Sequence, residues 1–380
     1  MPLTHAPLAA QAWLTLLRAP GLGGARIRAL IERFGSVEAA LDAGPAGWRG
    51  AGLPAASISW LRKVDAAAIA ADCDWLGAPN HYLVCIDGED FPPLLARTPN
   101  APAALFVVGP PAALWTAQVG IVGSRNPTSG GRDNARNFAA AFARAGLSIT
   151  SGLADGVDAE AHRAALDAKA ITIAVMGTGP DLIYPAANRQ LAHAIVDAGG
   201  ALVTEFPPAT SARREHFPRR NRIIAGLALG VVVIEAGLQS GALITARLAA
   251  EAGREVFALP GSIHNPMARG CHRLIREGVG LVESASEVLE ALAPAARELG
   301  SMLAARLDQD ETPAIAEAGS EFAADAERDR LWQALGHDPV AIEVLAERTG
   351  LTIEGLSAML LVLELEGRVA VSHGRYAREP

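Results

Sequence analysis

Hydrophobic and polar positions alternate in a regular order between residues 118 and 292. Short apolar runs lie at 118–124, 148–152, 171–177, 201–206, 230–236, 255–261 and, more briefly, 281–283. Stretches with helical periodicity separate them, and runs such as 231–234 are apolar throughout, as in strands buried on both faces. The pattern predicts an α/β fold with a Rossmann-like, doubly wound, mainly parallel sheet, whose ligands bind beyond the carboxyl ends of the strands.

The segment before this region is helical in its patterning. A Gly-rich turn, Pro20 to Gly24, separates two helical stretches, and the second has one apolar face formed by Ile27, Leu30, Ile31 and Phe34. A weaker copy follows at 49–63. The arrangement is similar to a helix-hairpin-helix module, whose backbone N–H groups can hold a DNA phosphate. A plain helical packing domain is the alternative. Two apolar runs within 80–115 predict edge strands or a lead-in to the next domain.

The last part of the chain changes character twice. Residues 293–326 lose periodicity, are rich in alanine and acidic residues, and are predicted to be a linker. Residues 327–380 show helix, helix, turn, helix and a hairpin centred on His373 and Gly374, the outline of a winged helix. The predicted domains are therefore 1–75 (helical), 80–292 (Rossmann-like), 293–326 (linker) and 327–380 (winged helix).

The net charge of −8 lies in one part of the chain. Lys and Arg total 33 and Asp and Glu 41, but residues 1–290 carry 25 of each sign, so the last 90 residues account for the whole excess. A nucleic-acid site in the first three quarters is therefore compatible with an acidic total. All but two of the cations are arginine, whose planar fork suits phosphate.

Composition also bears on the compartment. The three cysteines form no CxxC motif and are an odd set, which argues for a reducing compartment without structural zinc or disulfides. The first residues lack a basic segment ahead of an apolar core, and the most apolar stretch, 227–238, is too short to span a bilayer. We expect a cytoplasmic protein without membrane contact.

Two strand ends carry residues suited to an anion. The first predicted strand ends in Gly123, followed by Ser124 and Arg125 and then a helix that begins near Ser129. A later strand is followed by Ser240 and Gly241 at a helix start, which can offer a hydroxyl and N–H groups to a phosphate. A surface arginine and an ordinary helix cap are the alternatives. The loop 258–278, with Arg269, Arg273 and Arg276, could rim the same groove.

The strongest local signal lies at 205–228. Five arginines face two glutamates there, a local charge of +3, and an aromatic side chain interleaves with them. Arginines follow phosphates while an exposed ring stacks on a base, as in single-strand binding. A solvated loop paired with acids elsewhere is the alternative. The members are Arg213, Arg214, Phe217, Arg219, Arg220 and Arg222.

Other ligand chemistries are poorly supported. Asp158 and His162 are four residues apart on one predicted helix, with Asp155 nearby, and a local pair explains them better than a metal site. Gly177 and Gly179 are followed by Pro180 and lack the third glycine of a dinucleotide fingerprint. No GxSxG, HExxH or P-loop motif is present. We therefore expect no metal, no cofactor and no catalytic residue.

Several motifs in fixed order resemble one family. They are GIVGSR, SGLADGVDAEAH, GTGPDLIYPAANRQL, GGALVTEFP, HFPRRNRIIAGL, VVVIEAGLQSGALITARLAAEAGREVFALPG and GCHRLIREG. Over about residues 80–290 they closely resemble the DNA-processing protein A (DprA, also called Smf) family. The resemblance implies a dimeric, non-catalytic protein that binds and protects single-stranded DNA and helps to load RecA recombinase during natural transformation.

The resemblance also implies a set of DNA-binding residues. By motif match, Ser124 and Arg125 contact phosphate, and Ser240 and Gly241 approach the backbone. The basic pocket is implied to be lined by Arg214, Phe217, Arg219, Arg220 and Asn221.

Two further readings come from other classes of protein. The predicted Rossmann-like fold is similar to that of nucleotide phosphoribohydrolases with a PGGxGTxxE motif. A nucleotide-binding enzyme is therefore the main alternative. This chain has Leu248 where that motif has its glutamate after Thr245. A winged-helix transcription factor is disfavoured because the predicted recognition helix, 352–367, carries three glutamates and no Lys or Arg. We expect that module to contact protein, or to bind DNA weakly through Arg368, Arg375 and Arg378.

Overall fold

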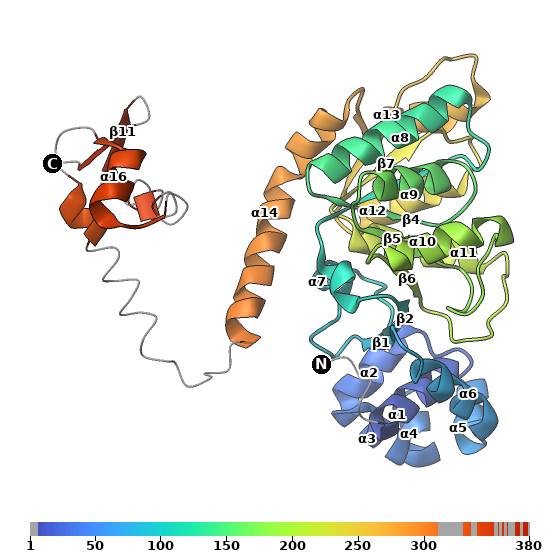
Figure 1. The fold of residues 1–380 in the computed structure, drawn as a ribbon. Helices are drawn as coiled ribbons and strands as arrows, with labels where there is room; N and C mark the ends of the chain where they lie inside the picture. Colours follow the sequence, from blue (N-terminus) through green and yellow to red (C-terminus); the bar gives the residue numbers. More distant parts are fainter. Residues whose placement is uncertain are drawn as a thin grey trace. The chain divides into compact units, whose positions relative to one another are not determined.

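The computed structural model describes residues 7–310, 330–335, 340–352, 356, 359–360, 363, 369–372 and 375–378. The chain forms two compact units, residues 1–304 and 305–380. Within the described residues of the larger unit, nine strands form one sheet in the order β1-β2-β6-β5-β4-β3-β7-β8-β9 (Figure 1). They are β1 (His81–Cys85), β2 (Ala104–Val108), β3 (Gln118–Gly123), β4 (Ser148–Ser151), β5 (Thr172–Val175), β6 (Ala201–Thr204), β7 (Gly230–Ile234), β8 (Glu255–Ala258) and β9 (Gly280–Leu281).

The predicted parallel sheet is confirmed. All neighbours from β6 to β9 pair in parallel, with Gly120 opposite both Thr150 of β4 and Val231 of β7. The strands stop one to three residues before the predicted ends, because the apolar runs continue into the loops that turn away from the sheet. Only the two preceding strands run differently: β1 and β2 are antiparallel to each other, and β2 is antiparallel to β6.

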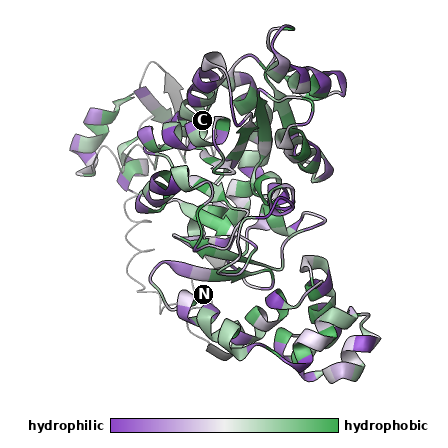
Figure 2. Ribbon diagram, turned by 90° about the vertical axis from the view of Figure 1, so that its right-hand side faces the viewer, coloured by the Kyte–Doolittle hydropathy of each residue, from purple (hydrophilic) through white to green (hydrophobic). Residues whose placement is uncertain are grey.

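Helices cover both faces of the sheet, as a doubly wound fold requires. In β7, Val231 and Val233 belong to the core under α11 and α12, whereas Val232 and Ile234 belong to the core under α8 and α9. Figure 2 shows these central strands as the most hydrophobic part of the unit. The helices are α7 (Pro93–Ala96), α8 (Ser129–Arg144), α9 (Val157–Asp167), α10 (Arg189–Asp197), α11 (His216–Leu227), α12 (Gly241–Glu251) and α13 (Arg269–Arg276).

From Pro7 onward, where the structure describes the chain, six short helices precede the sheet, as the patterning predicts. They are α1 (Pro7–Arg18), α2 (Gly24–Phe34), α3 (Val37–Asp42), α4 (Gly44–Gly50), α5 (Ala55–Arg62) and α6 (Ala66–Leu76). Ile27 and Leu30 on α2 are buried, and Leu83 of β1 and Phe106 of β2 join the same core. The prediction of edge strands is thus right for β1 and wrong for β2, which lies inside the sheet, and the helices cover one face of this pair.

The first hairpin of the helical segment is packed against the sheet domain. A Cβ on Gly24 would lie 2.4 Å from the Ala101 carbonyl oxygen, and Arg28 donates to the Pro99 carbonyl at 3.2 Å. The start of α2 therefore faces backbone of this chain. This contact leaves the helix-hairpin-helix prediction standing for the fold and argues only against phosphate binding at this hairpin.

Residues 293–310 are helical, although loss of periodicity predicts no regular structure there. Helix α14 (Ala285–Asp310) runs through Pro294, and Val288, Leu292 and Leu299 pack into the core. An alanine-rich sequence has high helix propensity, and one proline removes one backbone bond. The remaining linker residues, 311–326, lie outside the described residues, and the domain boundaries stay predictions.

The smaller unit has its own core of leucines at 331, 335, 345, 356, 360 and 363 with Val369. Strands β10 (Val340–Ala341), β11 (Val369–Ser372) and β12 (Arg375–Arg378) form a sheet in the order β10-β12-β11, beside α16 (Ile342–Thr349). The antiparallel β11–β12 pair confirms the predicted hairpin. Its turn at 373–374 and most of the predicted recognition helix, 352–367, lie outside the described residues.

Among the helices that the structure describes, none is both long enough and apolar enough to cross a bilayer.

Candidate nucleic-acid interface

The point where the strand order reverses lies between β3 and β7. Chain crossovers from β3 proceed through β4 and β5 to β6, and the chain then returns across the sheet to β7 on the other side of β3. Ligands of doubly wound sheets bind outside the carboxyl ends at such a point. A hollow of about 860 Å³ opens there, lined by residues from the loops after β3, β4, β5, β6 and β7 and from α11 and α12.

The loop after β3 places one free cation in this hollow. The Ser124 hydroxyl accepts a hydrogen bond from the Asn126 N–H at 3.1 Å, so this buried side chain shapes the turn. Arg125 is exposed, and its guanidinium lies 5.6 Å from the centroid of the Phe217 ring on α11. The motif thus divides its roles: the serine sets the turn and the arginine faces the hollow.

The arginine cluster of 205–228 separates into three environments. Arg213 and Arg214 are exposed and line the hollow. Arg219 and Arg222 both pair with the buried Glu205, at 2.7 and 2.5 Å. Arg219 is not among the residues that line the hollow, which departs from its implied place in the basic pocket.

Arg220 and Asn221 brace the site from beneath. Arg220 is only 4% exposed and donates to the carbonyl oxygens of Gly152 and Val175 and, at 2.9 Å, to the Asn221 side chain. Burial lowers the pKa of Arg220 to about 10, against the opposing effect of Asp158. The Asn221 amide donates to the Gly241 carbonyl at 3.3 Å and so joins α11 to α12. Both residues line the hollow, with most of each side chain below its surface.

The loop after β7 forms the opposite wall. The Ser240 hydroxyl caps α12 by accepting from the Ala242 N–H at 3.3 Å, and Gly241 is exposed beside it. Glu235, at φ +50°, accepts from both the N–H and the hydroxyl of Thr128, at 2.8 and 2.5 Å, and from the Asn265 amide at 3.1 Å. One carboxylate thus joins the loops after β3, β7 and β8, a link that the sequence pattern did not indicate.

Several lining residues were missed from the sequence. Tyr184, in the loop after β5, lies with its ring centroid 5.4 Å from that of Phe217, and Gln239 and Met267 also line the hollow. A tyrosine in a Gly-, Pro- and Asp-rich loop after a strand was the available signal. The loop after β8 reaches the hollow through Met267. The predicted rim residues Arg269, Arg273 and Arg276 are not among the lining residues.

The pair on α9 has a structural explanation. Asp158 accepts from the N–H groups of Gly152 and Ala154, and burial raises its pKa. The His162 ring bonds to the Thr172 hydroxyl at 2.7 Å. Among the residues that the structure describes, no three His, Cys, Asp or Glu side chains are grouped to hold a metal ion.

Comparison with known sequences decides the family. The family described as DNA recombination-mediator protein A matches residues 82–293. The chain belongs to this family. Two DprA domain families flank that match: the DprA-like N-terminal HHH domain at 9–68 and the DprA winged helix domain at 315–375.

Relatives extend the DprA match over nearly the whole chain. Protein Smf of Escherichia coli is 41% identical over 321 residues, which cover 84% of this chain and 82% of the relative. A putative DNA processing protein DprA of Mycobacterium tuberculosis is 34% identical over 97% of this chain and 94% of its own. The crystal structure of DprA from Streptococcus pneumoniae superposes with a TM-score of 0.65 at 34% identity, covering 74% of this chain and 97% of that one.

A second solved structure bears on the ligand of a relative. DNA processing protein A from Helicobacter pylori, described for its single-stranded DNA binding mode, superposes with a TM-score of 0.50 at 28% identity. The match covers 55% of this chain and 95% of that one.

Proposed function

We propose that the hollow between β3 and β7 binds single-stranded DNA, with phosphates held by Arg125, Arg213 and Arg214. The observation that carries this is the absence of acidic partners: within the described part of the chain, none of these three guanidinium groups makes an ion pair. Asp158 also lines the hollow, but its carboxylate is buried and accepts from the backbone N–H groups of Gly152 and Ala154. Three arginines on a concave surface, none of them paired with a carboxylate, favour an anionic ligand. Phe217, which also lines the hollow, adds an aromatic ring, and this suits a strand with exposed bases.

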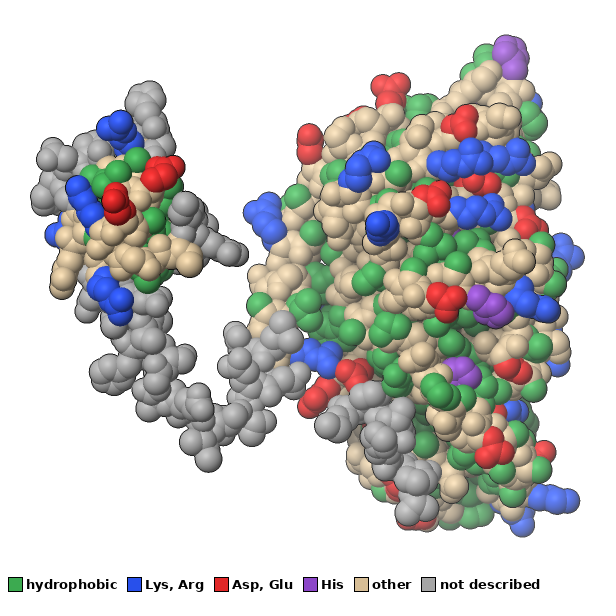
Figure 3. Space-filling model, in the orientation of Figure 1, with side chains coloured by type: hydrophobic (Ala, Val, Ile, Leu, Met, Phe, Trp, Pro, Cys, Tyr) green, Lys and Arg blue, Asp and Glu red, His purple; other side chains and the backbone are tan. Residues whose placement is uncertain are grey.

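Charges elsewhere on the same unit are arranged differently. Figure 3 looks onto the face that carries α8 and α9, where basic and acidic side chains lie side by side. There Arg136 pairs with Asp133 and Glu160, and Arg163 pairs with Glu160, at 2.7 to 3.3 Å. Paired charges offer little net attraction to a phosphate, so the contrast supports the hollow as the site.

The family supports the wider role. We infer that this protein, like the DNA processing relatives that it matches, is a recombination mediator that protects incoming single-stranded DNA and helps to load RecA during natural transformation. A homodimer, a cytoplasmic location and the absence of catalysis belong to the same proposal.

The rival reading, a nucleotide-processing enzyme, requires a carboxylate on α12. At that position Leu248 packs against the hydrophobic core instead. The nearby Thr245 is also buried, and its hydroxyl faces the Gly241 carbonyl at 3.5 Å. The helix therefore supplies a cap and a backbone approach rather than an acid or base, which favours binding over hydrolysis.

A salt series on single-stranded DNA tests the proposal. For wild type we expect tight, salt-sensitive binding of a labelled oligonucleotide and weaker binding of duplex, measured by fluorescence anisotropy. Arg125→Ala should weaken binding and lower the slope of log affinity against log salt by roughly 0.7, because one phosphate contact on a single strand is lost.

Arg144→Ala is the matched control. Arg144 is also exposed, but it ends α8 and so lies at the opposite edge of the sheet from the hollow. Equal losses for the two variants, or a wild type without strand preference, would show that the arginines of the hollow are not a DNA site.

A further inference from the structure

Tyr184 is the most exposed aromatic ring at the hollow. Its side chain belongs to a residue that is 49% exposed, whereas Phe217 beside it is half-buried. Leaving a large aromatic side chain in water forgoes the stabilisation that burial gives. An exposed ring on the wall of a concave, basic surface therefore points to a ligand rather than to the core.

The loop that carries Tyr184 is held in place on both sides. Before it, the Thr178 hydroxyl donates to the Leu182 carbonyl at 2.5 Å, and the Leu182 N–H donates to Gly179 at 3.1 Å. After it, the buried Asn188 donates to the Leu153 carbonyl at 2.9 Å. A ring on such a loop loses little further freedom when it binds, which lowers the entropic cost of stacking.

Neighbouring residues cover much of the Phe217 ring. The Arg125 guanidinium lies over its ring, Tyr184 packs at 44° to it, and Gly177 supports it from beneath. A Cβ at Gly177 would lie only 2.9 Å from the ring. The stacking surface that remains open is therefore shared, and much of it belongs to Tyr184.

We propose that Tyr184 stacks on a nucleobase of the bound single strand, as a second aromatic position next to Phe217. This inference rests on the proposed function and adds the orientation of the bound strand. Phosphates track along Arg125, Arg213 and Arg214, and the bases point toward the loop after β5. The ligand class is a strand with at least two unpaired bases, and a polyphosphate alone does not fill the site.

Two variants and two probes test the stacking. Tyr184→Ala should weaken binding of an oligothymidylate by roughly 5- to 150-fold, the range for one lost base stack, while Tyr184→Phe should bind like wild type because it keeps the ring. An abasic oligonucleotide of equal length keeps the phosphates and lacks the bases. Its affinity should be the same for wild type and Tyr184→Ala. An oligonucleotide with 2-aminopurine should be quenched on binding to wild type and less so on binding to Tyr184→Ala.

A double-mutant cycle separates a direct role from support of Phe217. If Tyr184 stacks on its own base, the loss in Phe217→Ala, Tyr184→Ala should approach the product of the single losses. A double variant no weaker than Phe217→Ala would overturn the inference, and so would a Tyr184→Ala variant with unchanged oligothymidylate affinity. Leu182→Ala, which removes an exposed apolar side chain from the same loop, should bind normally.

Failure of the proposed function would look different. In that case wild type itself would bind neither oligothymidylate nor the abasic strand, and Arg125→Ala would change nothing.

Discussion

The five arginines of the cluster have three different environments. Arg219 and Arg222 both pair with the Glu205 carboxylate, and Arg220 is buried among backbone carbonyl oxygens. Only Arg213 and Arg214 are exposed and line the hollow. At this scale residue type predicts little, since burial and partner decide whether a guanidinium is structural or free. The local charge of +3 counted from the sequence thus overstates the unpaired positive charge that α11 presents to the hollow.

His162 is a second residue whose role is set by burial. Its ring is fully buried on α9, and burial lowers its pKa to about 3. The Thr172 hydroxyl donates to the Ile149 carbonyl at 2.8 Å, so it accepts from the ring N–H at Nδ1, and Nε2 has no partner among the described residues. A proton at Nε2 would therefore be buried and unpaired.

Acid should unfold the protein partly through His162. Between the lowered pKa and the ordinary value near 6.5, the unfolded state binds the proton and the folded state does not, so stability falls as pH falls through this range. At about pH 4.5 the loss from this group is about 2–3 kcal/mol relative to neutral pH. Urea unfolding of wild type and His162→Gln at both pH values measures it. The variant should lose less stability by about that amount, and equal losses would contradict the assignment.

At the scale of elements, hydrophobic periodicity predicted most of what the structure contains. The parallel strands, the starts of α8 and α12, and the apolar face of α2 follow from local pattern, because each buries the side that the pattern marks. The position of β2 inside the sheet did not follow, since pairing with β6 is a contact between distant segments. The same reason hid Glu235 and Tyr184, whose partners lie in other loops.

The β-hairpin of the smaller unit carries an arginine that is engaged internally. The Arg378 guanidinium lies 4.5 Å from the Trp332 ring centroid and donates to the Trp332 carbonyl oxygen. The sequence predicts that this module contacts protein, or binds DNA weakly through Arg368, Arg375 and Arg378. Arg375 is exposed on the same strand pair, and Arg368 lies outside the described residues.

Arg378→Ala should therefore destabilise the smaller unit rather than weaken DNA binding. The loss of a cation–π contact and a charged hydrogen bond costs about 2 kcal/mol. Hydrogen–deuterium exchange of residues 330–335 in the full chain should become faster in Arg378→Ala and stay unchanged in Arg375→Ala. Slower or equal exchange in Arg378→Ala would show that the arginine does not hold Trp332.

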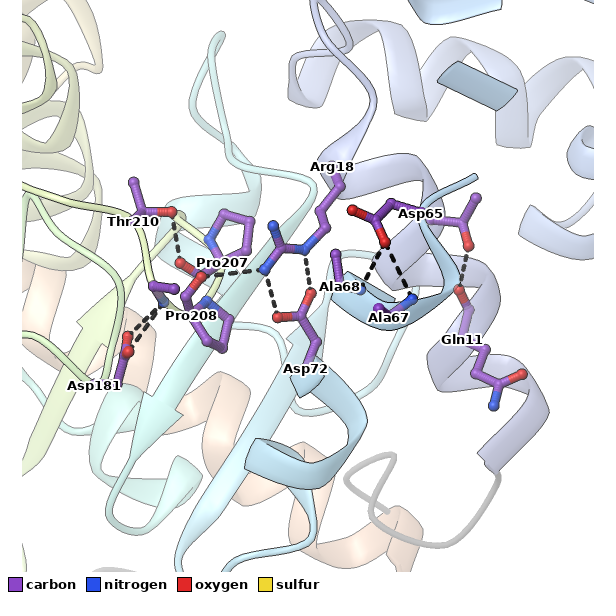
Figure 4. A network of polar contacts seen from close by, with 12 residues as sticks. Gln11, Arg18, Asp65, Ala67, Ala68, Asp72, Asp181, Pro207, Pro208 and Thr210 are labelled. Carbon is purple, nitrogen blue, oxygen red and sulfur yellow. Dashed lines mark hydrogen bonds and ion pairs between the residues drawn. The ribbon is translucent and has the colours of Figure 1, made fainter. Parts of the chain in front are cut away.

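At the scale of the larger unit, the helical segment is tied to the loop that leads into the arginine cluster. Figure 4 shows Arg18 of α1 between Asp72 of α6 and the loop at 207–210. Arg18 pairs with the buried Asp72 at 2.5 and 2.7 Å and donates to the Pro208 carbonyl at 3.1 Å. This hydrogen bond to Asp72 raises the pKa of Arg18. Asp181 holds the other side of the loop through the Ala209 N–H at 2.9 Å.

Removing the arginine should loosen that loop. Arg18→Met leaves the Asp72 carboxylate buried without a cation, which lowers the free energy of unfolding by about 3 kcal/mol. It also frees the Pro208 carbonyl, so exchange of the amides at 207–210 should accelerate and affinity for single-stranded DNA should fall. Arg26→Met is the control, since Arg26 reaches only the Gly21 carbonyl within its own segment. Wild-type exchange rates at 207–210 in Arg18→Met would show that Arg18 does not hold this loop in place.

The order of strands has a consequence for the timing of synthesis. Arg125 follows β3 and Arg214 precedes α11, but Ser240 and Gly241 lie beyond β7, which pairs with β3 only after β4, β5 and β6 have been made. A ribosome-bound chain that ends before β7 therefore carries the cations without the opposite wall. At about 5–20 residues per second, synthesis of the chain from Arg214 to Gly241 takes roughly 1–5 s. The hollow is therefore completed late in synthesis, and under the proposed function a newly made chain binds a strand only after β7 has paired with β3.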